Sequence, residues 1–200
     1  MNYFRYKTVI SSITYKTLHL MKQELYQTAM KFAGEKHHQQ KMKGCNANYL
    51  LHISNVAMEV IVAYYANKNF DINLAVQMAI LHDVIEDTSC DYEELEQTFG
   101  LDIAQGVQAL SKDQHIPKAS RIVDSLNRIN NLPKEVGIIK LADRITNLQE
   151  PPAFWDVEKI SAYLESSKLI LDKLSDKNEY LVARIDQKIQ DYGQYINLSI

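Results

Sequence analysis

The chain has 200 residues, of which 46% are hydrophobic and 24% are charged. This composition is ordinary for a globular protein with a sizeable core. The formal net charge of −3 is too small for the strongly charged classes that bind nucleic acids or membrane surfaces by general electrostatic attraction.

The beginning of the chain and its cysteines bear on where the protein works. The first 20 residues, "MNYFRYKTVISSITYKTLHL", lack the continuous apolar core of a signal peptide. They are either a short extension or lie upstream of a true start at Met21, and the sequence leaves both open. No apolar run approaches the ~18 residues of a membrane span. Cys45 and Cys90 form no CxxC pair, so we expect neither a disulfide framework nor a thiolate zinc site, and we expect a cytoplasmic protein.

Apolar residues repeat with helical period almost throughout the chain, which contains only 6 Gly and 4 Pro. Asp91 followed by Glu94 has the form of a capping box, Gly100 marks a helix stop, and "EPPAFWD" interrupts the pattern. No segment alternates as a half-buried strand does. The sequence predicts one all-α domain over residues 21–200, with helices at 15–37, 47–66, 71–87, 91–99, 101–111, 119–131, 134–149, 156–173 and 177–196, and with ends uncertain by about 2–4 residues.

The longest stretch without a helix signal is "HHQQKMKGCNAN", residues 37–48. It is locally basic, because Lys41 and Lys43 follow Lys36 and two histidines. Connections of this length are usually functional or disordered. By composition alone a solvated loop is the first interpretation. A loop that grips phosphate becomes the better one if the segment lies beside a site.

The stretch "ILHDVIEDT", residues 80–88, places four ionisable groups, those of His82, Asp83, Glu86 and Asp87, in two turns of an otherwise apolar helix. Residues three and four apart share a helix face, so both later acids lie within reach of Asp83. The bland interpretation is a helix end that emerges into water. Acids at a helix C-terminus, however, oppose the helix dipole by ~0.3–1 kcal/mol, and a bound cation would compensate for that cost.

A metal ion would need ligands from elsewhere in the chain. Imidazole and carboxylate groups without thiolates suit Mn²⁺, Fe²⁺ or Zn²⁺ in a catalytic site. His52, in "NYLLHISNVAMEV", is one candidate, although a lone histidine on an apolar helix is more often a core residue. Asp143, in "IIKLADRITNLQ", is another, on a stripe with Lys140, Arg144 and Asn147 that by default is solvated surface.

The order of His52, then His82–Asp83, then Asp143 resembles the HD superfamily of metal-dependent phosphohydrolases, which is named for its adjacent metal-binding His and Asp. "HDVIEDT" is similar to the HDxxEDT signature of the SpoT-type guanosine polyphosphate hydrolases, and "IKLADRITNL" to their KLADRxxNL segment. "FAGEKHHQQ" with "YLLH" and "EELEQTFGLDIAQGVQALSKD" are similar to the segments before and between these motifs. The resemblance covers about residues 26–170 and implies an HD-domain helical bundle.

The resemblance implies roles for eleven residues and one divalent metal ion, with Mn²⁺ expected and Fe²⁺ or Zn²⁺ as alternatives. The implied metal ligands are His52, His82, Asp83 and Asp143; the implied catalytic acids are Glu86 and Asp87; the implied substrate contacts are Lys41, Lys43, Arg144, Asn147 and Tyr163. Tyr163 follows Trp155 by eight residues, as in a W…Y pair whose tyrosine lies near the nucleotide.

The activity implied is removal of pyrophosphate from the 3′ position of guanosine polyphosphates such as ppGpp. The loop "QQKMKGCNAN" lacks the adjacent Arg-Lys pair and the proline common in these hydrolases, which leaves open the lysine that grips phosphate and the base recognised. Alternatives are an HD phosphatase acting on an adenine alarmone, a 2′- or 3′-phosphorylated dinucleotide or a nucleoside monophosphate, a nucleotide sensor without turnover, or an interaction-only bundle. The expected partner is a small phosphorylated nucleotide, not a nucleic acid or a membrane, and a homo-oligomer is left open.

Overall fold

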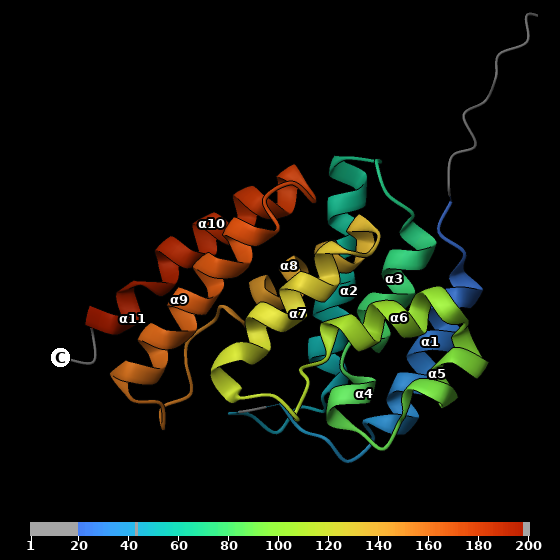
Figure 1. The fold of residues 1–200 in the computed structure, drawn as a ribbon, viewed down its shortest axis with the longest axis horizontal. Helices are drawn as coiled ribbons and strands as arrows, with labels where there is room; N and C mark the ends of the chain where they lie inside the picture. The colour runs from blue at the N-terminus through green and yellow to red at the C-terminus, as the bar shows by residue number, and fades with distance from the viewer. Residues whose placement is uncertain (1–19, 43, 198–200) are drawn as a thin grey trace, which may run out of the picture.

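The computed structural model describes residues 20–42 and 44–197, which fold into helices and connections without a β-strand (Figure 1). The all-α prediction is confirmed. In chain order the helices are α1 (Gln23–Lys36), α2 (Leu50–Ala66), α3 (Ile72–Leu81), α4 (Val84–Asp87), α5 (Tyr92–Phe99), α6 (Leu101–Leu110), the 3₁₀ turn η1 (Lys118–Ser120), α7 (Arg121–Asn130), α8 (Lys134–Asn147), α9 (Val157–Lys173), α10 (Glu179–Tyr192) and α11 (Gln194–Asn197).

Polar side chains begin several of these helices. Asp71, Asp91, Asp156 and Asn178 each accept a hydrogen bond from a backbone N–H in the first turn that follows. Gly100 ends α5 with φ of 89°, a left-handed conformation that glycine adopts without a steric cost. The predicted cap and stop around α5 are therefore confirmed. The predicted 15–37 helix begins at Gln23 in the described part of the chain, and its residues 15–19 lie outside that part.

The single helix predicted over 71–87 is wrong, because the chain leaves the helical path between α3 and α4. Asp83 has φ of −108° and ψ of 0°, outside the α region, and its carboxylate turns back toward the His82 ring. Glu86 and Asp87 consequently lie in a short helix of their own. The expected conflict between these acids and the dipole of a long helix does not arise.

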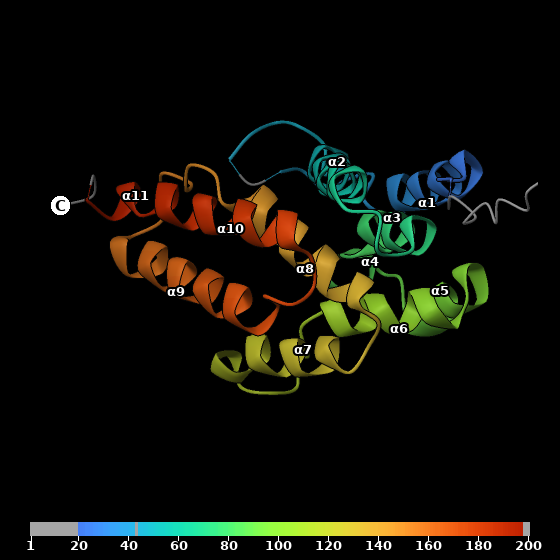
Figure 2. The ribbon, with the colours of Figure 1, turned by 90° about the horizontal axis from the view of Figure 1, so that it is seen from above.

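Helix α8 lies in the middle of the molecule, with α2 to α6 on one side and α9 and α10 on the other (Figures 1 and 2). It packs against α2, α3, α6, α7, α9 and α10, and every residue from Glu135 to Thr146 is buried. The expectation of a solvated stripe on this helix is wrong for Lys140, Asp143 and Arg144, which are only 6%, 9% and 7% exposed. Burial of three charged groups requires partners nearby, which the site supplies.

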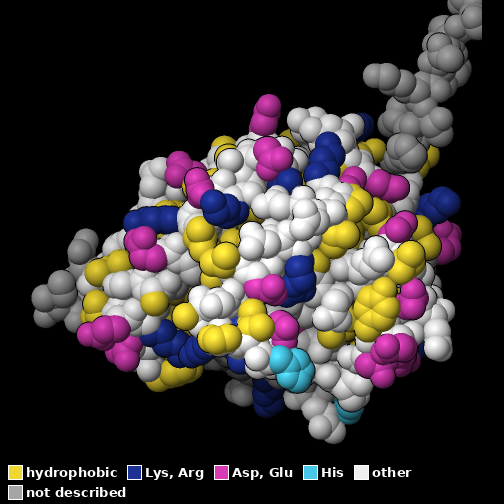
Figure 3. Space-filling model, in the orientation of Figure 1, with side chains coloured by type: hydrophobic (Ala, Val, Ile, Leu, Met, Phe, Trp, Pro, Cys, Tyr) yellow, Lys and Arg dark blue, Asp and Glu magenta, His cyan; other side chains and the backbone are white. Residues whose placement is uncertain are grey.

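The surface agrees with the small net charge. On the face drawn in Figure 3, basic and acidic side chains are interspersed. Across residues 20–42 and 44–197, no helix is both long enough and apolar enough to cross a bilayer.

The burial of α8 predicts where the fold is most sensitive. Leu141, fully buried at its centre, loses its packing in Leu141→Ala, and the cavity left behind should lower the free energy of unfolding by about 2–5 kcal/mol. Leu101→Ala is the matched control, since Leu101 is 49% exposed and should cost about 0.5 kcal/mol. Urea denaturation of both variants measures the difference, and equal losses would contradict the central place of α8.

Candidate active site

Three separate segments bring the four predicted metal ligands together. His52 comes from α2, His82 and Asp83 from the junction of α3 and α4, and Asp143 from α8. The Nε2 atom of His52 lies 3.2 Å from Nε2 of His82 and 3.4 Å from Oδ1 of Asp143. The Nε2 atom of His82 lies 2.9 Å from Oδ2 of Asp83 and 3.9 Å from Oδ1 of Asp143. The four ligand atoms thus face one small volume.

These separations fit a single bound cation. Bonds of about 2.0–2.2 Å to one ion place neighbouring ligand atoms about 3–4 Å apart. His52, His82 and Asp83 form a group of potential ligand atoms all within 4.8 Å of one another, and Asp143 adds a carboxylate oxygen to it. Two imidazoles and two carboxylates are a donor set suited to a divalent metal ion.

Outer partners orient the ligands. The Nδ1 atom of His82 lies 2.8 Å from the backbone oxygen of Ala79, so Nδ1–H donates there and Nε2 points into the cluster. The hydroxyl of Tyr49 donates to Oδ2 of Asp83 at 2.5 Å. Such contacts fix both the rotamer and the tautomer of a ligand, and they raise its affinity for metal.

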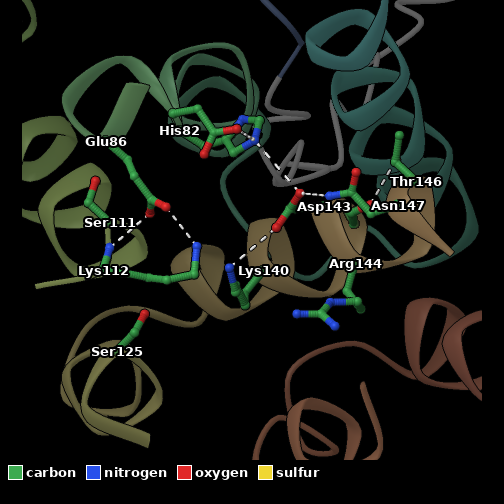
Figure 4. A network of polar contacts seen from close by, with 12 residues as sticks. His82, Glu86, Ser111, Lys112, Ser125, Lys140, Asp143, Arg144, Thr146 and Asn147 are labelled. Carbon is green, nitrogen blue, oxygen red and sulfur yellow. Dashed lines mark hydrogen bonds and ion pairs between the residues drawn. The ribbon is translucent and has the colours of Figure 1, made fainter. Parts of the chain in front are cut away.

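Asp143 has its own partners along α8. The Asn147 amide donates to Oδ1 at 2.6 Å, and the Lys140 ammonium donates to Oδ2 at 3.3 Å. Oδ1 of Asp143 therefore faces the histidines, while Oδ2 is held by the buried Lys140 ammonium (Figure 4).

The charges of this cluster shift its pKa values. Burial would lower the pKa of His82, but the carboxylates of Asp83 and Asp143 raise it to about 9. Burial would raise the pKa of Asp83 and of Asp143, yet His82 lowers the former and Lys140 lowers the latter below their usual range. Because an imidazole must lose its proton from the nitrogen that binds a metal, a divalent ion at this cluster would compete with protons for His82.

The two predicted catalytic acids lie beside the cluster on α4, and each has a partner. Both oxygens of Glu86 accept hydrogen bonds from Lys112, one from its backbone N–H at 2.9 Å and one from its ammonium at 2.7 Å. Oδ2 of Asp87 accepts from the Gln40 amide at 2.8 Å. Through this contact the 37–48 loop lies against the site, which favours the phosphate-loop interpretation over the solvated one.

The predicted substrate contacts divide into two groups. Asn147 donates a hydrogen bond to Asp143, one of the predicted metal ligands. Arg144 extends from the opposite side of α8 (Figure 4), where its guanidinium donates to Ser166 and Ser167 and stacks 4.2 Å from the Tyr163 ring. Tyr163 also contacts Trp155, with ring centroids 5.3 Å apart, so the expected W…Y pair is in contact.

The structure describes only one of the two loop lysines that were predicted to contact the substrate. The Lys41 ammonium lies 3.5 Å from the Asn46 side-chain oxygen within its own loop. Lys43 lies outside the described residues.

Sequence reasoning missed four polar residues that hold the site: Gln40, Tyr49, Lys112 and Lys140. Tyr49 and Lys140 could have been found, because each precedes a predicted ligand by three residues, the spacing of one helix face. Lys112 lies 26 residues from Glu86, and no local pattern indicates the contact.

Tyr49 provides a test of the metal cluster. Tyr49→Phe removes the hydrogen bond to Asp83 but leaves all four ligands, so metal should still bind at one equivalent with affinity reduced about 10–100-fold. Asp83→Ala, which removes a ligand, should abolish stoichiometric binding. Calorimetric titration with Mn²⁺ measures both, with Tyr65→Phe, at a residue 71% exposed, as the control. Unchanged affinity in Asp83→Ala would rule out this cluster as the metal site.

Known proteins are similar to this chain in sequence. A model of the HD domain family matches residues 29–154. A relative from Danio rerio, named guanosine-3′,5′-bis(diphosphate) 3′-pyrophosphohydrolase MESH1, is 30% identical and covers 80% of this chain and 87% of its own. The relative of the same name from Xenopus tropicalis is 28% identical and covers 82% and 93%.

A solved structure is similar to this chain in fold. Described as a metazoan orthologue of SpoT that hydrolyses ppGpp, it matches with a TM-score of 0.74 at 25% identity, over 87% of this chain and 98% of its own. The resemblance read from the motifs is confirmed at the level of family and fold. This chain belongs to the HD-domain family, among the MESH1-type guanosine-3′,5′-bis(diphosphate) 3′-pyrophosphohydrolases.

Proposed function

We propose that the protein is a metal-dependent hydrolase that removes pyrophosphate from the 3′ position of guanosine polyphosphates such as ppGpp. The observation that carries this proposal is the convergence of four ligand atoms from three distant segments, with two further acids beside them. The names of its full-length relatives supply the substrate class.

In this proposal His52, His82, Asp83 and Asp143 ligate one divalent ion, and Mn²⁺ is the expected one, with Fe²⁺ and Zn²⁺ as alternatives. The support is the mixed imidazole and carboxylate donor set, which has no thiolate. An ion that prefers six ligands keeps positions for other oxygens when the protein supplies four. Bound there, it supplies Lewis acidity for a phosphoryl oxygen and for water.

The two acids of α4 then handle water and protons. Glu86 is held by two hydrogen bonds from Lys112, so its oxygens have a fixed position from which to orient or deprotonate the attacking water. Asp87 is exposed and has one side-chain partner, Gln40, so it is accessible to a leaving oxygen that takes up a proton. Because adjacent acids titrate as a coupled pair, the order of these two roles is a property of the pair.

The remaining predicted contacts would hold the nucleotide. Asn147 can reach it from the ligand end of α8, and Lys41 and Lys43 from the loop that touches Asp87. Arg144 would act through Tyr163, because its guanidinium stacks on that ring and binds the serines of α9. Tyr163 in turn offers an aromatic face near the metal-binding helix.

We also propose a cytoplasmic location, as the sequence led us to expect. Cys45 and Cys90 are both free thiols in the described structure, the state that a reducing compartment maintains. Cell fractionation with an antibody to the protein tests this, and recovery in a secreted fraction would contradict it.

The altered loop favours one second candidate, an HD phosphatase for a different phosphorylated nucleotide. The loop, "QQKMKGCNAN", lacks the adjacent Arg-Lys pair and the proline that the guanosine polyphosphate hydrolases often carry. A panel of ppGpp, pppGpp, adenine counterparts, 3′-phosphorylated dinucleotides and nucleoside monophosphates with Mn²⁺ separates the two. Pyrophosphate release from ppGpp and pppGpp supports the main proposal, whereas phosphate release from another member in their place would replace it.

The role of Glu86 leads to a kinetic prediction. Glu86→Gln keeps the shape of the side chain but removes the charge that accepts a proton, so turnover should fall about 10²–10⁴-fold. Metal content should remain at the parent level, because Glu86 is not a predicted ligand. Glu93→Gln on the exposed face of α5 is the matched control. Full turnover of Glu86→Gln on every nucleotide in the panel would remove Glu86 from the mechanism.

A further inference from the structure

The substrate proposed above carries several negative charges, and the cations expected to meet them are largely turned elsewhere. The Arg144 guanidinium is committed to Tyr163, Ser166 and Ser167 on the far side of α8. The Lys41 ammonium is exposed and lies against Asn46 of its own loop. The described part of the site therefore needs another source of positive charge.

Two lysines that lie inside the quoted motif segments, but to which the resemblance gave no role, point into the site. Lys112, in the connection after α6, and Lys140, on α8, extend toward each other in the gap between Glu86 and Asp143 (Figure 4). Lys112 donates from Nζ to Glu86 at 2.7 Å, and Lys140 donates from Nζ to Asp143 at 3.3 Å. The two ammonium groups thus come from different parts of the chain and point into the same space between Glu86 and Asp143.

Each ammonium has donors to spare. An ammonium carries three N–H bonds, and among the described residues each Nζ atom donates to one carboxylate oxygen. The Lys140 side chain is 8% exposed, whereas that of Lys112 is 40% exposed. Lys112 is therefore the more accessible of the two to an anion from solvent, and Lys140 lies deeper.

The charges around the Lys112 and Lys140 ammonium groups indicate which kind of ligand the two lysines would bind. A buried ammonium needs a compensating anion, and Asp143 compensates Lys140 through Oδ2. A divalent cation on the Oδ1 side of the same carboxylate would compete for that negative charge and repel both lysines. A phosphate group placed between the metal and the lysines would relieve the repulsion, since its oxygens accept hydrogen bonds from ammonium groups and bind metal as well.

We infer that Lys112 and Lys140 form a phosphate-binding pair that receives the diphosphate of the substrate and holds it against the metal side of the site. This inference rests on the proposed phosphohydrolase function. It assigns to α8 and to the connection after α6 a source of positive charge in addition to the lysines of the 37–48 loop, which lacks the adjacent Arg-Lys pair. The occupant is defined by its chemistry, a diphosphate group with several negatively charged oxygens.

Binding of inorganic pyrophosphate to the full-length, Mn²⁺-loaded protein tests the inference. Lys112→Met and Lys140→Met keep the length of the side chain and remove the charge, so each should weaken pyrophosphate binding about tenfold or more in calorimetric titration. Lys140→Arg keeps the charge and should restore much of the affinity. Lys168→Met is the matched control, because Lys168 pairs with Glu165 at 2.8 Å on an exposed face of α9.

Metal content and thermal unfolding of each variant are measured alongside. Parent-level pyrophosphate affinity in both Met variants, or no pyrophosphate binding by the parent protein, would overturn the inference. Should Lys140→Met fail to fold, the more exposed Lys112→Met decides alone. If the Met variants lose pyrophosphate binding but the parent protein does not hydrolyse ppGpp, the proposed substrate is wrong and the lysine pair stands. If the parent protein hydrolyses ppGpp but the Met variants bind pyrophosphate as the parent does, the proposed substrate stands and the lysine pair is wrong.

Discussion

The fold depends on bringing two carboxylates and two imidazoles to one point inside a helical bundle. Groups of this kind are costly to bury, and they stay buried only when each has a partner. Helix α8 buries the most charged groups, because it carries Asp143 through the middle of the molecule and has almost no exposed surface of its own. The surrounding helices are arranged so that α2 and the α3–α4 junction present the other three predicted ligands to it.

Each acid at the site has its own partner. Asp83 faces His82 and Tyr49, Asp143 faces Lys140 and Asn147, Glu86 faces Lys112, and Asp87 faces Gln40. The partners come from the loop after α1, the residue that begins α2, the α3–α4 junction, α8 and the connection after α6. The acids are therefore positioned before any ligand arrives, a condition under which electrostatic groups act without reorganising.

Helix periodicity and motif order predicted most of the fold and the four residues that converge. The 3.6-residue period located nearly every helix, and the YLLH and KLADR segments selected His52 and Asp143 from many polar residues. What the sequence could not provide was direction and distant pairing. The kink at Asp83 depends on a side-chain contact with His82, and the Arg144 side chain takes the opposite side of α8 from Asp143 because the serines of α9 lie there. The pairing of Lys112 with Glu86 joins two segments that no periodic pattern links.

The aromatic stack near α8 has a practical consequence. Trp155 is the only tryptophan in the chain, and it rests edge-on against Tyr163, which also contacts the Arg144 guanidinium and the Tyr192 ring. The ammonium of Lys159 also lies 4.5 Å from the indole. Indole fluorescence excited selectively therefore reports from a single location, beside the helix that carries Asp143. The protein contains its own optical probe of that corner, with no label required.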